Sequence, residues 1–232
     1  MKQPIPILAL DVPDASAAFA LLERAGPAAD FVKVGLQLFT AEGPGIVREL
    51  RGRGLRVFLD LKLHDIPNTV AHAVKSAAAL DVDLLTVHAS GGPSMLRAAA
   101  EAAGARLRLL GVTVLTSLGD EELARAWGRD AVRAEDEVAR LAGMARECGI
   151  PGVVASVHEL PAVRRAAGEE MLVLTPGIRL PGDAAGDQSR VATPAEAARL
   201  GADYVVLGRS VTAAADPAAA LARAMEELAS IH

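Results

Sequence analysis

Aromatic residues and cysteine are both scarce in this sequence. Phe, Trp and Tyr together make up 3% of the 232 residues, so the core must be built mainly from aliphatic side chains. Cys148 is the single cysteine and cannot form an internal disulfide, which fits a reducing cytoplasm. A chain of this length can bury enough apolar surface to need neither a disulfide nor a structural metal.

Long apolar runs and an excess of positive charge are also missing. No stretch approaches the roughly 18 consecutive apolar residues of a membrane span. The apolar run before Asp11 is too short for a secretory signal. A net charge of −5 lacks the basic footprint of a nucleic-acid-binding protein. We therefore expect a cytoplasmic protein with neither a membrane nor a nucleic acid as partner.

The sequence does contain a regular alternation of short apolar runs and longer, alanine-rich amphipathic stretches. Continuous runs rich in Val and Leu are typical of parallel strands that are buried on both faces. Eight strands are expected, at Ile5–Leu10, Phe31–Gly35, Val57–Leu61, Leu84–His88, Leu109–Leu115, Gly152–Val157, Met171–Thr175 and Tyr204–Leu207. Helices are expected between them, at residues 15–25, 42–53, 68–80, 92–103, 120–148, 158–167, 194–200 and 217–230.

Eight strand–helix units without a change of composition predict a single α/β domain, a (β/α)₈ TIM barrel over residues 1–232. The main alternative is an open, doubly wound sheet. Such a sheet usually carries a glycine-rich phosphate turn after its first strand. Here the first strand is followed by Asp11-Val-Pro-Asp, which contains no glycine, so the closed barrel is favoured.

Charged residues close the first three predicted strands. They are Asp11, Lys33, and Asp60 with Lys62, and Asp65 follows three residues later. In TIM barrels the carboxyl ends of the strands meet at one mouth, where the chemistry takes place. Each residue alone could be an ordinary surface charge. As a set, alternating carboxylates and ammonium groups are costly to bury unless they are paired, and such sets are typical of functional sites.

The choice of lysine for both cations is a second indication. The chain has only four lysines, at positions 2, 33, 62 and 75, against 20 arginines. Lysine can release a proton, whereas arginine does not readily do so, and a lysine in this setting fits general acid chemistry. The alternative interpretation is that lysine merely fits the available space.

A metal site is the natural competitor for these carboxylates. Asp11, Asp60 and Asp65 could bind Mg²⁺. However, Lys33 and Lys62 alternate with them and can supply the positive charge instead, and the histidines show no metal-ligand spacing. We therefore expect neither a metal nor another cofactor.

The last two predicted strands end in Thr175-Pro-Gly-Ile-Arg179 and Gly208-Arg209. Barrels often bind phosphate at the loops after these two strands, and two arginines suit a phosphate dianion. Residues 180–190 between them are small and turn-forming. They predict a mobile loop that closes over the ligand, with a plain solvated loop as the alternative.

The segment Asp60-Leu-Lys62-Leu-His-Asp65-Ile-Pro-Asn-Thr69 resembles the D-x-K-x-x-D signature of the bacterial type of orotidine 5′-phosphate decarboxylase. The resemblance covers the whole chain, including Lys33-Val-Gly, Val-Leu-Thr116-Ser117, Thr175-Pro-Gly-Ile-Arg179, Gln188 and Gly208-Arg209. It implies a homodimer that converts orotidine 5′-monophosphate (OMP) to uridine 5′-monophosphate (UMP) and CO₂ in de novo pyrimidine biosynthesis. The alternatives are a metal-dependent phosphosugar decarboxylase or aldolase on the same barrel and a non-catalytic nucleotide-binding barrel.

The resemblance also implies a role for each residue. Lys62 is the expected proton donor to C6 of the pyrimidine, Asp60 lies against the substrate carboxylate, and Asp65 reaches in from the second subunit. Lys33 is also an expected catalytic residue, since Asp11 and Lys33 hold the ribose and orient the charge network. The other expected substrate-binding residues lie near the pyrimidine (Thr116 and Ser156), hold the phosphate (Arg179, Gln188 and Arg209) or complete the substrate-binding set (Thr69, Pro176 and Gly208).

Overall fold

Eight parallel strands form a closed barrel in the computed structural model, which describes residues 3–182 and 191–230. The strands are β1 (Ile5–Ala9), β2 (Phe31–Gly35), β3 (Arg56–Leu63), β4 (Leu84–His88), β5 (Arg108–Val112), β6 (Gly152–Val154), β7 (Leu172–Ile178) and β8 (Tyr204–Leu207). They pair in sequence order, and β8 returns to pair with β1. The prediction of a (β/α)₈ barrel is confirmed.

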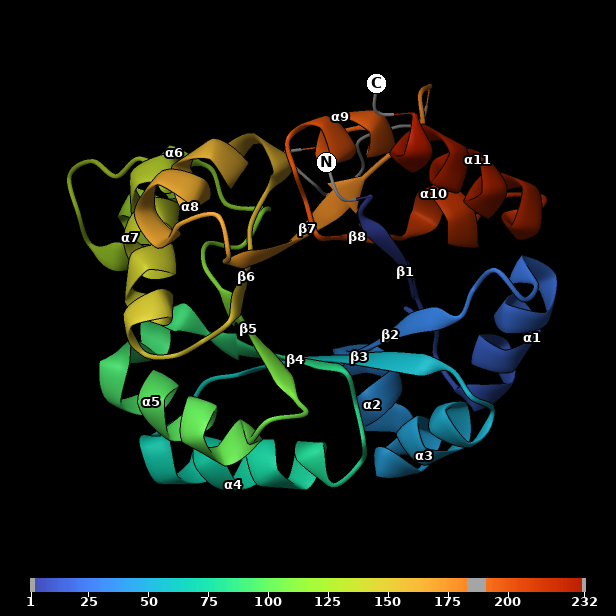
Figure 1. The fold of residues 1–232 in the computed structure, drawn as a ribbon, viewed down its shortest axis with the longest axis horizontal. Helices are drawn as coiled ribbons and strands as arrows, with labels where there is room; N and C mark the ends of the chain where they lie inside the picture. The colour runs from blue at the N-terminus through green and yellow to red at the C-terminus, as the bar shows by residue number, and fades with distance from the viewer. Residues whose placement is uncertain (1–2, 183–190, 231–232) are drawn as a thin grey trace.

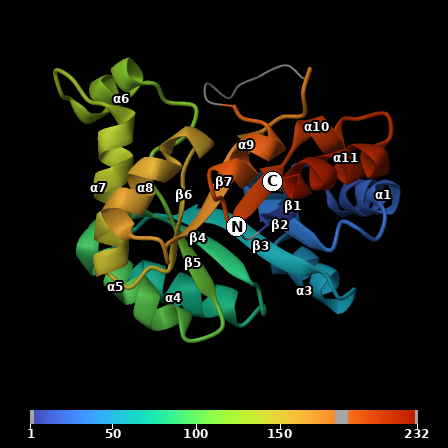
Figure 2. The same ribbon diagram turned by 45° about the horizontal axis from the view of Figure 1, so that its top comes forward.

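The helices form an outer layer around the barrel, as Figures 1 and 2 show. They are α1 (Ala15–Ala25), α2 (Leu36–Glu42), α3 (Pro44–Gly52), α4 (Pro67–Ala78), α5 (Gly92–Ala103), α6 (Asp120–Trp127), α7 (Ala134–Glu147), α8 (Leu160–Ala167), α9 (Pro194–Arg199), α10 (Arg209–Thr212) and α11 (Pro217–Ala229), with short 3₁₀ turns η1 (Ala89–Gly91) and η2 (Val157–Glu159). In both views α7 and α8 lie on the side of the barrel opposite α1 and α11. None of the helices in the described part of the chain has the length and apolar character that crossing a membrane requires.

One helix prediction was wrong, and two helices were not predicted. The single helix expected at residues 120–148 is two helices, because Gly128 adopts the left-handed conformation that ends α6 and helical structure resumes only at Ala134. The helix expected from residue 42 is preceded by α2, and Gly43, with a φ of 62°, separates α2 from α3. The short helix α10 directly after β8 was not expected at all.

Several strand ends also differ from the prediction, and these ends surround the mouth. β3 and β7 run further than expected, to Leu63 and Ile178, whereas β5 and β6 stop earlier, at Val112 and Val154. Apolar runs alone cannot place these ends, because the loops at the mouth continue the apolar pattern of the strands. The loop expected at residues 180–190 falls mostly outside the described residues, which omit 183–190.

The core has two layers. An inner cluster fills the barrel itself and consists of Ile7, Ala9, Phe31, Phe58, Leu84, Leu110, Leu174, Tyr204 and Val206. The alternate residues of the same strands, such as Leu8, Val32 and Leu59, pack outward against the helices. The outer layer is mainly aliphatic, as expected. Three of the six aromatic residues, Phe31, Phe58 and Tyr204, lie inside the barrel, whereas Phe19, Phe39 and Trp127 pack against the outer layer.

Candidate active site

A cavity of about 480 Å³ opens where the strands end at their carboxyl sides. Its apolar surface comes from the top of the inner core and includes Phe58, Leu174 and Val206. Charged and hydroxyl side chains from the strand ends line the rest of it. An apolar surface with a few converging polar groups is typical of a small-molecule site, and its place in the barrel is where TIM-barrel enzymes carry out their chemistry.

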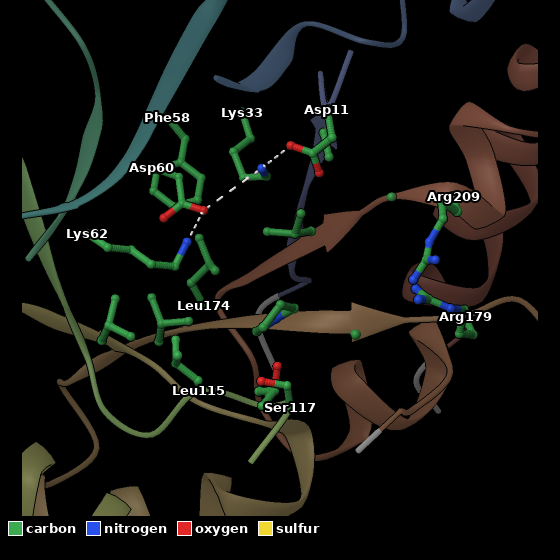
Figure 3. A pocket seen from close by; sticks show the side chains of 18 of the residues that line it. Asp11, Lys33, Phe58, Asp60, Lys62, Leu115, Ser117, Leu174, Arg179 and Arg209 are labelled. Carbon is green, nitrogen blue, oxygen red and sulfur yellow. Dashed lines mark hydrogen bonds and ion pairs between the residues drawn. The ribbon is translucent and has the colours of Figure 1, made fainter. Parts of the chain in front are cut away.

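Asp11, Lys33, Asp60 and Lys62 form a continuous chain of ion pairs along this cavity (Figure 3). Lys33 Nζ lies 2.7 Å from Asp11 Oδ1 and 3.9 Å from Asp60 Oδ2. Lys62 Nζ lies 2.7 Å from the same Asp60 oxygen. The side chains of Lys33 and Asp60 are only 9% and 13% exposed. Their burial is tolerated because two carboxylates and two ammonium groups balance one another.

The strand β3 departs from regular pairing where it carries Asp60 and Lys62. Three of its residues, Asp60 to Lys62, stand opposite the single residue Thr86 of β4. Lys62 has a φ of 49°, in the left-handed region that non-glycine residues rarely adopt. A β-bulge of this kind redirects side chains, and here it lets the Lys62 ammonium meet the Asp60 carboxylate inside the cavity.

His88 and His64 lie next to this array, with ring centroids 5.3 Å apart. Burial, followed by the neighbouring charges of His64 and Lys62, lowers the pKa of His88 below its ordinary value. The His88 imidazole is therefore neutral at pH 7 and adds no positive charge beside the Lys62 ammonium.

Two arginines lie across the cavity from Lys62. Figure 3 shows Arg179 and Arg209 close together on one side and Lys62 on the opposite side. Arg179 follows β7 and donates from Nη1 to the Ile178 carbonyl at 2.9 Å, while Arg209 begins α10. Pro176 and Gly208 line the same part of the cavity. Paired guanidinium groups at this position can bind an anion such as a phosphate.

The other residues singled out in the sequence lie in different places. Thr116 is buried and lines the cavity. Ser156 does not line it, because its hydroxyl accepts a hydrogen bond from the His158 backbone and begins η2. Asp65 and Thr69 are exposed and lie outside the cavity lining of their own chain. Gln188 falls outside the described residues.

Two residues that the sequence reasoning missed support the charged array. Thr86 is a fully buried hydroxyl that contacts both Asp60 and Lys62. Gly35 ends β2, and a Cβ placed there would lie 2.9 Å from Lys33 Nζ and 3.0 Å from Asp11 Oδ1. Thr86 had one visible signal, since it is a polar residue in the middle of an apolar strand. The closeness of Gly35 to the ion pair needs three-dimensional geometry.

The fold and the site together define an α/β-barrel enzyme that combines an Asp–Lys–Asp–Lys array with a pair of arginines in one cavity. Residues 4–224 match the family described as "Orotidine 5'-phosphate decarboxylase / HUMPS family". The chain therefore belongs to this family.

The chain is also similar to individual proteins of known name. The chain is 53% identical over 222 residues to the orotidine 5′-phosphate decarboxylase of Moorella thermoacetica, covering 92% of this chain and 88% of that protein. It is 54% identical over 212 residues to the protein of the same name from Anaeromyxobacter dehalogenans, covering 91% and 92%. The crystal structure of orotidine 5′-phosphate decarboxylase from Lactobacillus acidophilus superimposes with a TM-score of 0.86 at 36% identity, covering 98% of this chain and 99% of that chain.

Proposed function

We propose that this protein decarboxylates OMP to UMP and CO₂ as a step in pyrimidine biosynthesis. Relatives that are about half identical over nine-tenths of the chain are named for this activity. The observation that carries the proposal is the Lys62 ammonium, held 2.7 Å from Asp60 in a cavity whose far side presents Arg179 and Arg209. This arrangement matches a substrate with a phosphate at one end and a carboxylate at the other.

Substrate binding follows from the layout of the cavity. The phosphate binds to Arg179 and Arg209, and the pyrimidine lies over the apolar surface with its carboxylate toward Asp60 and Lys62. Asp11 and Lys33, which are paired at 2.7 Å, are placed to contact the ribose between these ends. Phosphate contacts far from the reacting carbon can still support catalysis, because their binding energy holds the reacting groups in place.

Decarboxylation then breaks the bond between C6 and the carboxyl carbon. The bonding electron pair stays on C6, CO₂ departs, and Lys62 donates a proton to C6 to give UMP. The resulting neutral amine regains a proton from solvent. A positive charge already fixed beside C6 stabilises the developing carbanion without reorganisation, which is the most effective form of electrostatic catalysis. Asp60 keeps the ammonium aimed at C6, and its repulsion of the substrate carboxylate is relieved as CO₂ leaves.

The main rival is a metal-dependent phosphosugar decarboxylase or aldolase on the same barrel. It differs in substrate, since a sugar phosphate lacks the pyrimidine that the apolar surface of the cavity accommodates. Incubation of the purified protein with OMP, monitored by pyrimidine absorbance, separates the two functions. We expect UMP to form at a rate proportional to enzyme. Turnover of a hexulose 6-phosphate in the presence of Mg²⁺, with no turnover of OMP, would refute the proposal.

We further propose that the protein is a homodimer in which Asp65 completes the active site of the partner subunit. Asp65 is exposed and outside the cavity of its own chain, and Ile66 beside it is 66% exposed. Leu36 is also exposed, and both of these apolar residues follow the carboxyl end of a strand. Exposed apolar residues at one end of a barrel are typical of a surface that another chain covers.

Complementation between two inactive variants tests the shared site. Lys62→Ala and Asp65→Ala are unfolded together and refolded as a mixture. In a mixed dimer, one site combines the intact Lys62 of one chain with the intact Asp65 of the other. Random pairing makes about half of the dimers mixed, so roughly a quarter of the wild-type activity should return.

The controls for this experiment are the two variants refolded separately and an affinity tag that proves subunit mixing. Each variant alone must be nearly inactive. A proven mixture without recovered activity would show that Asp65 serves its own chain. If the wild-type protein has the mass of a monomer in solution, the proposal of a homodimer is refuted.

We also propose a cytoplasmic location. Cys148 is buried and forms no disulfide, which fits a reducing compartment. Fractionation of cells that express the protein from its own gene should place it with cytoplasmic enzymes, and recovery in an exported fraction would contradict this.

A further inference from the structure

Thr86 in the middle of β4 has no part in the reaction as proposed, yet it contacts both central residues. Its side chain is 0% exposed, and it is not among the residues that line the cavity. A substrate bound in the cavity therefore cannot touch the Thr86 hydroxyl. Any effect of Thr86 on the reaction must act through its neighbours.

Regular pairing between β3 and β4 is interrupted at Thr86. On one side Leu59 pairs with Leu85, and on the other side Leu63 pairs with Val87. Three residues of β3 thus stand opposite one residue of β4, so the usual ladder of backbone hydrogen bonds cannot be completed there. A buried backbone N–H in such a gap needs another partner.

The Thr86 hydroxyl supplies that partner and makes a second hydrogen bond as well. Its Oγ1 accepts from the Lys62 backbone N–H at 2.9 Å and donates to Asp60 Oδ1 at 2.9 Å. A hydroxyl has one proton to give and lone pairs to accept, so both bonds can exist together. One oxygen of Asp60 is thereby fixed, and its other oxygen, Oδ2, is left for Lys62 Nζ at 2.7 Å.

We propose that Thr86 is a positioning residue for the decarboxylation, a role that rests on the proposed function. The Thr86 hydroxyl holds the Lys62 backbone at its left-handed φ of 49° and sets the rotation of the Asp60 carboxylate. Without this hydroxyl, both groups shift and the ammonium is no longer aimed at C6. A displacement of about 1 Å at a reacting group can lower the rate roughly 100-fold.

The test compares Thr86→Val, which keeps the shape and loses the hydroxyl, with Thr86→Ser, which keeps the hydroxyl. We expect kcat with OMP to fall roughly 10- to 100-fold in Thr86→Val and to stay within about threefold of wild type in Thr86→Ser. The dissociation constant of UMP should change by less than about threefold in both variants, because Thr86 does not touch the ligand.

If Thr86→Val does not fold, a second matched pair of variants takes its place. Thr86→Ala and Thr86→Ser both lose the methyl group and differ in the hydroxyl alone. A difference in kcat of less than about tenfold between the hydroxyl-containing and hydroxyl-free members of the folded pair overturns the proposal. An equal loss of UMP affinity and kcat also overturns it, because that result indicates a deformed cavity.

Amide hydrogen exchange tests the role of Thr86 independently of enzymatic activity. A wild-type protein that does not convert OMP refutes the proposed function and leaves the exchange experiment valid. If Thr86 holds Lys62, the Lys62 amide should exchange at least about tenfold faster in Thr86→Val and be unchanged in Thr86→Ser. Equal exchange in the two variants would mean that the hydroxyl does not hold this segment.

Discussion

The two ends of the barrel both carry clusters of charged side chains, but they satisfy these charges differently. At the amino end, the Asp83 carboxylate accepts hydrogen bonds from Arg51, Arg56 and the Val57 backbone. At the carboxyl end, the Asp60 carboxylate contacts the side chains of Lys33, Lys62 and Thr86 and faces the cavity.

Aromatic rings complete the closed amino end. The Arg56 guanidinium lies 4.0 Å from the centre of the Phe31 ring, and Phe31 packs edge-on against Tyr204. Arg108 donates to the Tyr204 hydroxyl at 2.9 Å. Charged side chains therefore stabilise the fold at the amino end, where neighbouring groups form hydrogen bonds with them. The same residue types are available for chemistry at the carboxyl end, where they face an open cavity.

The largest effect on activity is expected from Lys62→Ala at the mouth. Loss of the only proposed proton donor should lower kcat at least about 100-fold, because positioned acid catalysis typically contributes ~10²–10⁴-fold. Thermal unfolding should stay close to that of the wild type. Lys75→Ala is the matched control, since Lys75 is exposed near the end of α4. Retention of more than about a tenth of the wild-type kcat by Lys62→Ala would reject it as the donor.

Removal of a phosphate contact comes next. Arg209→Ala should lower kcat/KM for OMP by about 10- to 100-fold, since a hydrogen bond to a charged group contributes roughly 1.5–3 kcal/mol. The slow reaction of free orotidine, which has no phosphate, should be nearly unchanged. Arg223→Ala on the exposed face of α11 serves as control. An equal loss with both substrates would place the role of Arg209 elsewhere.

Gly35→Ala should have a moderate effect that is confined to activity. Gly35 has a φ of −93°, which alanine adopts easily, but the new Cβ would crowd the Lys33–Asp11 pair. These side-chain ends can move aside, so we expect kcat to fall by about tenfold with little loss of stability. Gly45→Ala has open space around its Cβ and is the control. Unchanged kcat in Gly35→Ala would show that the Lys33–Asp11 geometry is not critical.

The smallest effect on activity is expected at the closed end. Tyr204→Phe removes the partner of Arg108 and should lower the free energy of unfolding by about 1 kcal/mol. We expect kcat with OMP to stay within about twofold of wild type, because Tyr204 and Arg108 lie at the amino end of the barrel and the catalytic residues lie at the carboxyl end. Chemical denaturation and steady-state kinetics on one preparation measure both. A large loss of kcat without loss of stability would break the distinction between the two ends.

The sequence alone was sufficient to predict the barrel and the residues of the charged array. The array was predictable because its residues lie within or just after the carboxyl halves of the first three strands, and parallel strands in a barrel bring these ends together. The break between α6 and α7 was not predictable, because a single Gly128 can be tolerated in a helix and only its left-handed backbone ends α6. The amphipathic pattern continues across that break.

The details that aim the side chains were also beyond the sequence. The bulge in β3 arises from pairing with β4, and no local pattern around Lys62 signals its positive φ. Ser156 shows the converse case, a predicted site residue that does not line the cavity. A hydroxyl at a strand end can also cap a helix, and Ser156 caps η2. Strand-end position predicts which residues gather at the mouth but not which of them face the cavity.

In the proposed function, the side chains of this protein carry out the decarboxylation of OMP without a bound metal. The most direct measurement is the rate of UMP formation before and after exhaustive dialysis against a chelator, with metal content determined on the same sample. We expect the rate per active site to be unchanged after metal removal, because Lys33 and Lys62 supply the positive charge. A loss of activity that returns on addition of Mg²⁺ would contradict the claim.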